Sequence, residues 1–185
     1  DATNVAHALV CGLTPVSYEH TQKLGSTLRE IAGEKAGIVK HADSVVICAP
    51  QEEEALRVIR GRCRQIKAKL FEVGKDIFCE DSLAGFHVMS LFAEYPDLQI
   101  QLIGKHQRIN AAVAIGMAEA LRYHDVFIRA QDIREGLRQA VWPGRCEVIS
   151  SNPLTVLDGA QNVASARALK QAVKDNFQYK KLILV

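Results

Sequence analysis

Long apolar stretches are missing from this chain of 185 residues, although 48% of its residues are hydrophobic. No apolar run approaches the roughly 20 residues that a membrane-spanning helix needs, so we expect no membrane partner. An excess of one charge is also missing, since 23 basic residues stand against 21 acidic ones. This balance gives no reason to expect a nucleic-acid partner. The apolar content is nevertheless sufficient for a buried core.

Paired cysteines are missing as well. The five cysteines are widely spaced and form no C-x-x-C motif: Cys11, Cys48, Cys63, Cys79 and Cys146. An odd number with this spacing fits neither a disulfide framework nor a zinc site. We expect reduced, mostly buried thiols in a cytoplasmic protein.

Both ends of the chain suggest a fragment. The chain begins with Asp1 rather than Met, and residues 181–185 have the pattern of an apolar strand. A folded domain rarely ends on such a strand with nothing to cover it. The missing targeting signal therefore carries little weight.

Alternating apolar runs and amphipathic stretches predict an α/β fold. Helices are expected at 27–37, 50–66, 107–121, 130–140 and 163–177. Strands are expected at 8–13, before a turn at Pro15, and at 44–49, 70–73, 76–79, 85–93, 98–103, 146–150, 154–157 and 181–185. Residues 95–97 are expected to form the turn between two of these strands.

Two features define the expected boundaries most clearly. Thr27 and Glu30 fit a capping box at the start of the first helix, and Gly37 is expected to end it. The strand–helix–strand order after Trp142 predicts a parallel βαβ unit. We therefore place a domain boundary near Val141, between segments 1–141 and 142–185.

The first polar cluster indicates a metal site. His20 follows the first apolar run, where open α/β sheets build their sites, although a structural histidine is the common alternative. Lys35 lies on the apolar side of its expected helix. It is either a snorkelling lysine with its ammonium in water or a partly desolvated, reactive amine. A neutral amine can take up carbon dioxide as a carbamate, an anionic oxygen ligand that suits Mg²⁺.

Two further clusters flank the expected boundary. Residues 104–110 begin a helix and add two positive charges to an N-terminus that attracts anions, although an ordinary basic helix start fits equally well. Arg145 could clamp a phosphate with its fork of donors. Asp158 stands between a strand and a helix, where such sheets present binding loops. A structural N-terminal helix cap is the alternative for Asp158.

Taken in order, these clusters resemble one family. The segments DATN, LGSTLREIAGEKAGIVK, GKHQRINAA, WPGR and LDGAQN resemble folylpolyglutamate and dihydrofolate synthases, which are relatives of the Mur ligases. Residues 24–40 are the most specific part. The resemblance implies an incomplete P-loop-type Mur ligase central domain in 1–141, followed by the start of a Rossmann-like C-terminal domain in 142–185.

The implied activity is an ATP-dependent ligase that adds L-glutamate to dihydropteroate or to folates. ATP phosphorylates the acceptor carboxylate, and the amino group of glutamate attacks the acyl phosphate. Such chemistry needs Mg²⁺ to neutralise phosphate charge and a cleft that orients both substrates. The implied partners are small molecules only, bound by a monomer.

The resemblance also implies residue roles. His20 and Lys35 match a magnesium-binding histidine and a carbamylated lysine, both catalytic. The ATP-binding positions of the family are matched by Asn110, Arg145 and Asp158. Asp1 and Ala2 match the edge of the pteroate-binding segment.

The chain departs from the family pattern at two positions. Glu19 stands where the family usually has Asp, which keeps the carboxylate. Gln161 stands where it usually has His, and an amide cannot carry a proton near neutral pH. The family's glycine-rich phosphate loop and its metal-binding Glu precede DATN, so we expect the 185 residues alone to have no ligase activity.

Two alternatives stay open. The first is another Mur-type ligase, acting on a peptidoglycan precursor; the GEKAGIVK segment favours the folate branch. The second is a non-catalytic nucleotide-binding module, which would fit Gln161. The presence of all the matched site residues argues against loss of function.

Overall fold

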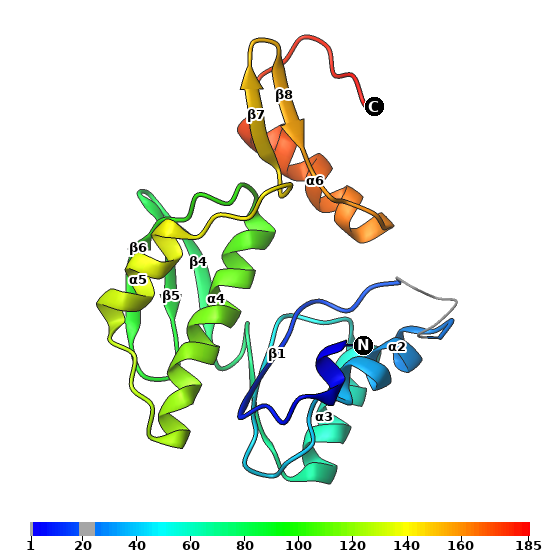
Figure 1. Ribbon diagram of the computed structural model, residues 1–185, viewed down its shortest axis with the longest axis vertical. Helices are drawn as coiled ribbons and strands as arrows, with labels where there is room; N and C mark the ends of the chain where they lie inside the picture. The colour runs from blue at the N-terminus through cyan, green and yellow to red at the C-terminus, as the bar shows by residue number, and fades with distance from the viewer. Residues whose placement is uncertain (1, 19–24) are drawn as a thin grey trace.

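The computed structural model describes residues 2–18 and 25–185, without the side chains of residues 2 and 3. Within these residues the chain forms a parallel sheet, an antiparallel sheet and a separate hairpin, each covered by helices (Figure 1). This arrangement confirms the predicted mixed α/β class. None of the helices in this part of the chain combines the length and apolarity needed to cross a membrane.

The parallel sheet has the order β1 (Val10–Leu13), β2 (Val45–Cys48), β3 (Lys69–Glu72). Every residue of the central strand β2 is buried, which is typical of a parallel strand covered on both faces. Val45 and Ile47 face the helix α4 (Lys105–Ala120), whereas Val46 and Cys48 face the opposite layer. The alternation follows from the two-residue period of a strand.

The opposite layer consists of the helices α2 (Leu28–Ala36) and α3 (Glu53–Ile66). The predicted capping box is confirmed: Thr27 Oγ1 accepts from the Glu30 amide, and Glu30 accepts from the Thr27 amide. Gly37 ends α2 as predicted. The apolar stripe of α3 is also confirmed, because Ala55, Ile59 and Cys63 are buried.

The antiparallel sheet contains β4 (Phe78–Ser82), β5 (Gly85–Met89) and β6 (Glu94–Leu98), in that order. The turn predicted at 95–97 is wrong, since these residues lie inside β6 and the chain reverses before Glu94. Pro96 is tolerated there because β6 is an edge strand, where a missing amide breaks no ladder. The burial of Tyr95 and Leu98 against α4 fixes the strand at this position.

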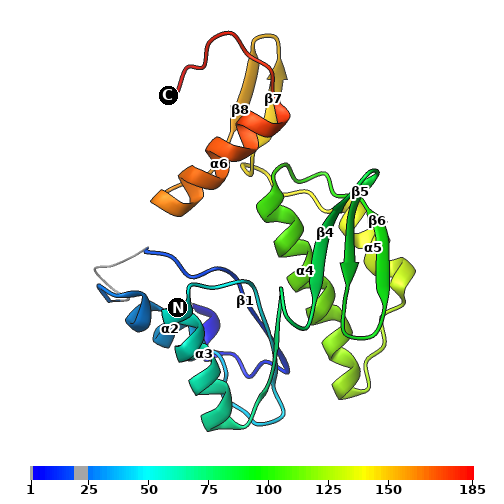
Figure 2. The ribbon, with the colours of Figure 1, turned by 180° about the vertical axis from the view of Figure 1, so that it is seen from behind.

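The helices η2 (Leu121–His124) and α5 (Ala130–Gln139) lead to the C-terminal unit, which we define as residues 142–185. This unit contains β7 (Glu147–Ser151), β8 (Leu154–Leu157) and α6 (Val163–Asn176), and it lies beside the start of α4 (Figures 1 and 2). At the opposite end of the chain, η1 (Ala2–Val5) precedes β1.

Of the βαβ unit predicted after Trp142, the strand at 154–157 and the helix at 163–177 are present as β8 and α6, but the last strand is not. β7 and β8 pair antiparallel, because two residues join them and only antiparallel strands tolerate so short a connection. Residues 181–185 form no strand, and their apolar side chains are exposed. An apolar pattern becomes a strand only where a neighbouring strand can pair with it.

Candidate functional site at the junction of alpha 4 and the C-terminal unit

Backbone hydrogen bonds join the two loops that contain the third polar cluster. The carboxylate of Asp158 accepts from the amides of Cys146 and Ala160, both at 2.8 Å. The Gly159 amide donates to the Gly144 carbonyl at 2.8 Å. Asp158 therefore connects the WPGR segment to the loop before α6.

Arg145 lies within this pair of loops with an exposed side chain. A Cβ added to Gly159 would lie 3.6 Å from Arg145 Nη1, so the guanidinium packs beside the Gly159 backbone. Gly144 precedes it with a φ of 71°, a left-handed conformation that favours glycine, and its amide donates to Glu147. Within residues 2–18 and 25–185, no carboxylate forms an ion pair with Arg145, so its donors remain available to an anion.

His106, in the first turn of α4, faces these loops. Burial lowers the pKa of His106 below its ordinary value; the neighbouring Asp158 opposes this change and Arg145 adds to it. A Cβ added to Gly104 would lie 2.7 Å from Cε1 of His106, so the imidazole packs beside this glycine. Gly104 completes the contact, because a Cβ there would lie 3.2 Å from Cβ of Ala172 in α6.

Asn110 lies one helical turn after His106, on the same face of α4. Its side-chain amide donates to the buried Gln107 at 2.9 Å. Among the described residues, its side chain makes no hydrogen bond to Arg145 or Asp158. The structure therefore places Asn110 on the relevant face without joining it to the other two residues.

The two positive charges predicted at the start of α4 are both paired with one carboxylate of β4. Lys105 Nζ lies 3.5 Å from Asp81, and Arg108 also bonds Asp81. Both cations are thus paired, which favours the ordinary structural interpretation of this helix start over an anion site. Local sequence patterns do not predict this pairing, because Asp81 lies more than twenty residues upstream.

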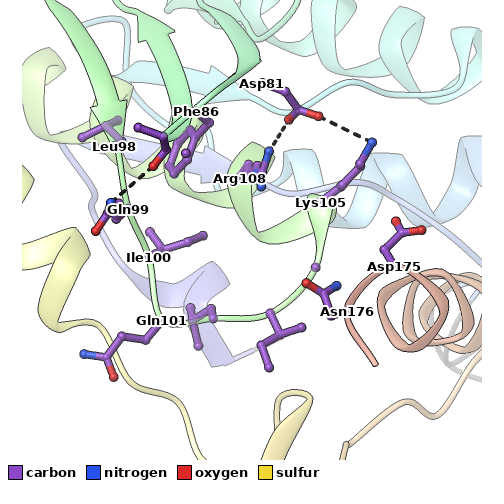
Figure 3. Close-up of a pocket in the computed structure, with 15 residues that line it drawn as sticks. Asp81, Phe86, Leu98, Gln99, Ile100, Gln101, Lys105, Arg108, Asp175 and Asn176 are labelled. Atoms are coloured by element: carbon purple, nitrogen blue, oxygen red, sulfur yellow. Dashed lines mark hydrogen bonds and ion pairs between the residues drawn. The ribbon is translucent and has the colours of Figure 1, made fainter. Parts of the chain in front are cut away.

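A cavity of about 480 Å³ adjoins the Asp81 cluster (Figure 3). It lies between the loop after β6 and the end of α6, which contributes Asp175 and Asn176. Charged residues of both signs line it together with residues 98–104. Sequence reasoning missed this cavity, because its walls come from three stretches that are far apart in the chain, 81–86, 98–108 and 175–176.

The first polar cluster is only partly described. His20 and Glu19 lie outside the described residues, as does Asp1, and the side chain of Ala2 is also outside them. Lys35 lies in the last turn of α2, one turn after the buried Ile31, and is half-buried. Within the described residues, no group of three or more His, Cys, Asp or Glu could hold a metal.

The alternative role of Asp158, as the N-terminal cap of α6, is wrong. The N-cap of α6 is Asn162, whose side chain accepts from the Ser165 amide at 2.8 Å. Asp158 precedes the helix and stabilises the loop instead. Gln161 exposes its side chain beside this loop.

The comparisons with known proteins agree over nearly the whole chain. A dihydrofolate synthase/folylpolyglutamate synthase of Bacillus subtilis is 38% identical over 192 aligned residues, covering all of this chain and 44% of that protein. A structure described as an FPGS–AMPPCP–folate complex matches with a TM-score of 0.91 and 31% identity, over 97% of this chain and 45% of that one. Mycobacterium tuberculosis folylpolyglutamate synthase complexed with ADP matches with a TM-score of 0.84 and 30% identity, over 96% and 41%. No family model matches.

The fold and the joined loops therefore define a mixed α/β segment of a larger enzyme fold. This segment spans less than half the length of the relatives and structures named above. The chain belongs to the folylpolyglutamate synthase/dihydrofolate synthase family. Both the fold class and the resemblance expected from the sequence are confirmed.

Proposed function

We propose that the protein containing this chain is an ATP-dependent ligase that adds L-glutamate to dihydropteroate, to folates or to both. The observation that carries the proposal is the pair of loops joined through Asp158, with the exposed Arg145 packed beside Gly159. Similarity to a structure holding both an ATP analogue and folate supports it. Because this chain spans less than half of its relatives, the activity belongs to the whole protein.

In this proposal Arg145 contacts the phosphates of ATP. Its guanidinium is exposed and has no carboxylate partner among the described residues, so a phosphate could take its donors bidentately. Asp158 already accepts two backbone hydrogen bonds, and a carboxylate retains further lone pairs for a nucleotide donor. Asn110 contributes from the same face of α4 as His106.

We assign the acceptor site and the Mg²⁺ site to the N-terminal part of the chain. Lys35, as a carbamate, and His20 would hold Mg²⁺, which would neutralise phosphate charge. The half-buried position of Lys35 is compatible with a carbamate, but the described residues alone form no metal cluster. Asp1 and Ala2 would lie at the edge of the pteroate site.

A two-domain organisation completes the proposal, with 1–141 in the central domain and 142–185 in the C-terminal domain. The separate sheet of β7 and β8 supports this division. Arg145 and Asp158 would then reach the nucleotide from the second domain. We further propose a cytoplasmic monomer with ATP, glutamate and a pterin acid as its partners.

The test is incorporation of labelled glutamate by the chain expressed together with its flanking coding sequence. Arg145→Ala should raise the KM for ATP by roughly 10- to 100-fold, as expected for lost hydrogen bonds to a charged group. Arg129→Ala is the matched control, because Arg129 is an exposed arginine paired with Asp132. Its KM for ATP should stay unchanged.

Three outcomes would contradict the proposal. Glutamate transfer to neither dihydropteroate nor folate would remove the assigned activity. Amino-acid transfer to a nucleotide-linked muramyl acceptor would favour another Mur-type ligase, and nucleotide binding without any ligation would favour a non-catalytic module. Turnover by the 185 residues alone would contradict our prediction that they are inactive.

A further inference from the structure

The segment before β1 lies along the loop before β2 and is held there by side-chain hydrogen bonds. Lys40 Nζ donates to Asn4 Oδ1 at 3.2 Å, and Ser44 Oγ donates to the Ala8 carbonyl at 2.9 Å. The first ladder bonds of the parallel sheet follow directly, beginning with the Val45 amide and the Leu9 carbonyl at 2.8 Å. These contacts fix the two segments against each other.

Two exposed histidines meet between those contacts. His7 Nδ1 lies 2.6 Å from His41 Nε2. The ring centroids are 4.8 Å apart, so the two nitrogens occupy the facing edges of their rings. The rings are inclined by only 30°. Two imidazole nitrogens are therefore directed at one point on the surface, from segments that the sheet holds in place.

We propose that His7 and His41 bind one divalent transition-metal ion between Nδ1 and Nε2. Imidazole is a preferred ligand of Zn²⁺, Ni²⁺ and Cu²⁺, whereas Mg²⁺ prefers oxygen. With bonds of about 2.0–2.1 Å at a tetrahedral ion, the nitrogens need to be roughly 3.3 Å apart. The rings therefore separate by roughly 0.7 Å, which exposed side chains can do without disturbing the core.

Water completes the coordination, because no group of three metal-ligating residues exists within the described part of the chain. In the neutral pair, one ring donates its N–H to the other. When the ion binds, that hydrogen moves to the distal nitrogen of its own ring, so that both facing nitrogens can donate lone pairs. This site is separate from the proposed Mg²⁺ site at Lys35 and does not depend on the proposed ligase activity.

The test is titration of the purified chain with NiCl₂ by calorimetry. We expect one equivalent bound by the unmodified chain. His7→Ala and His41→Ala should each weaken binding at least about tenfold, since even changes to the partners of metal ligands cost roughly 10- to 100-fold. Lys40→Ala is the matched control for the attachment of the segment, because it removes the Asn4 contact and keeps both imidazoles. His87→Ala controls for the other histidines.

A second measurement reports the ligands directly. The electron paramagnetic resonance spectrum of bound Cu²⁺ should show two coordinated nitrogens, and only one in either histidine variant. Circular dichroism and thermal melts would establish that each variant folds. Equal Ni²⁺ affinity in the unmodified chain and in both histidine variants would overturn the proposal, as would the absence of binding by the unmodified chain.

Discussion

The parallel-sheet region and the C-terminal unit bury their side chains to very different extents. In the first region, all four residues of β2 are buried, with helices packed on both faces. In the described C-terminal unit, the buried residues are Cys146 and Ala172, and each lies near the junction with α4 or in the joined loops. Apolar residues of β7 and β8, including Leu154 and Leu157, remain exposed.

This difference separates the region that supplies most of the stability from the loops that are proposed to bind the nucleotide. Apolar burial supplies most of the free energy of folding and fixes one arrangement in the parallel-sheet region. The C-terminal unit depends on directional hydrogen bonds at Gly144, Cys146 and Asp158. Such bonds define the local geometry of a site and add about 1 kcal/mol each.

The largest expected effect compares the two regions directly. Ile47→Ala should lower the free energy of unfolding by about 2–5 kcal/mol, because Ile47 is fully buried and its truncation leaves a cavity. Leu157→Ala, whose residue is 51% exposed, should change it by less than about 0.5 kcal/mol. Urea unfolding measures both. Equal losses would show that the C-terminal unit has a core comparable to that of the parallel sheet.

The second prediction concerns how tightly α4 packs on the sheet. Gly116→Ala should destabilise by about 1–3 kcal/mol, because its Cβ would lie 2.5 Å from Ile77 and 3.1 Å from Ile47. Gly61→Ala in α3 meets no atom within 4 Å and should stabilise by roughly 0.5–1 kcal/mol. The midpoint temperature of thermal unfolding should fall in Gly116→Ala and rise in Gly61→Ala. A stabilising Gly116→Ala would mean that the layer is loosely packed.

The third prediction compares the two capping boxes. Asn162→Ala and Thr27→Ala each remove a cap worth about 1 kcal/mol. In Asn162→Ala, hydrogen exchange should detect the loss of stability in α6 alone, because little of α6 is buried. Thr27→Ala should lower the global stability, because Ile31 and Ala32 of α2 are part of a buried hydrophobic cluster. Global loss in both variants would show that the two regions unfold together.

The smallest effect is expected at the ion pair between Arg60 and Glu72. Hydrogen bonds from the Arg60 guanidinium, at 2.9 and 2.6 Å, lower the pKa of Glu72 below its ordinary 4.5. This pair therefore stabilises the fold above about pH 4.5, and the contribution is lost as the pH falls through the lower folded value. Because Arg60 is partly exposed, Glu72→Gln should lose at most about 1 kcal/mol at pH 7.

Measurements of stability against pH would check this expectation. The Glu72→Gln variant should show a flatter decline below pH 4.5 than the unmodified chain. Glu53→Gln is the control, because Glu53 and Arg57 form an exposed surface pair. A steeper acid decline in Glu72→Gln than in the unmodified chain would contradict the assignment.

Local patterns predicted the elements whose signals lie within one turn or one strand. The capping box at Thr27 and the apolar stripe of α3 are local, and both were correct. The turn expected at 95–97 was wrong, because burial of Tyr95 against a distant helix outweighed the turn preference of Pro96 and Asp97. The last strand of the unit expected after Trp142 is not present, because pairing depends on which strands lie nearby.

The candidate site likewise has features that the sequence predicts and features that only the structure shows. The motifs around Arg145 and Asp158 were visible in the sequence, since their residue types and their order along the chain suffice to name them. The pairing of Lys105 and Arg108 with Asp81, and the meeting of His7 with His41, came only from the structure. The family resemblance, the order of the main helices and most of the core faces can be predicted from the sequence, because they follow from residue type and local period. The tertiary structure decided which charges are neutralised and which side chains face one another, because such contacts join residues far apart in the chain through the packing of the sheets.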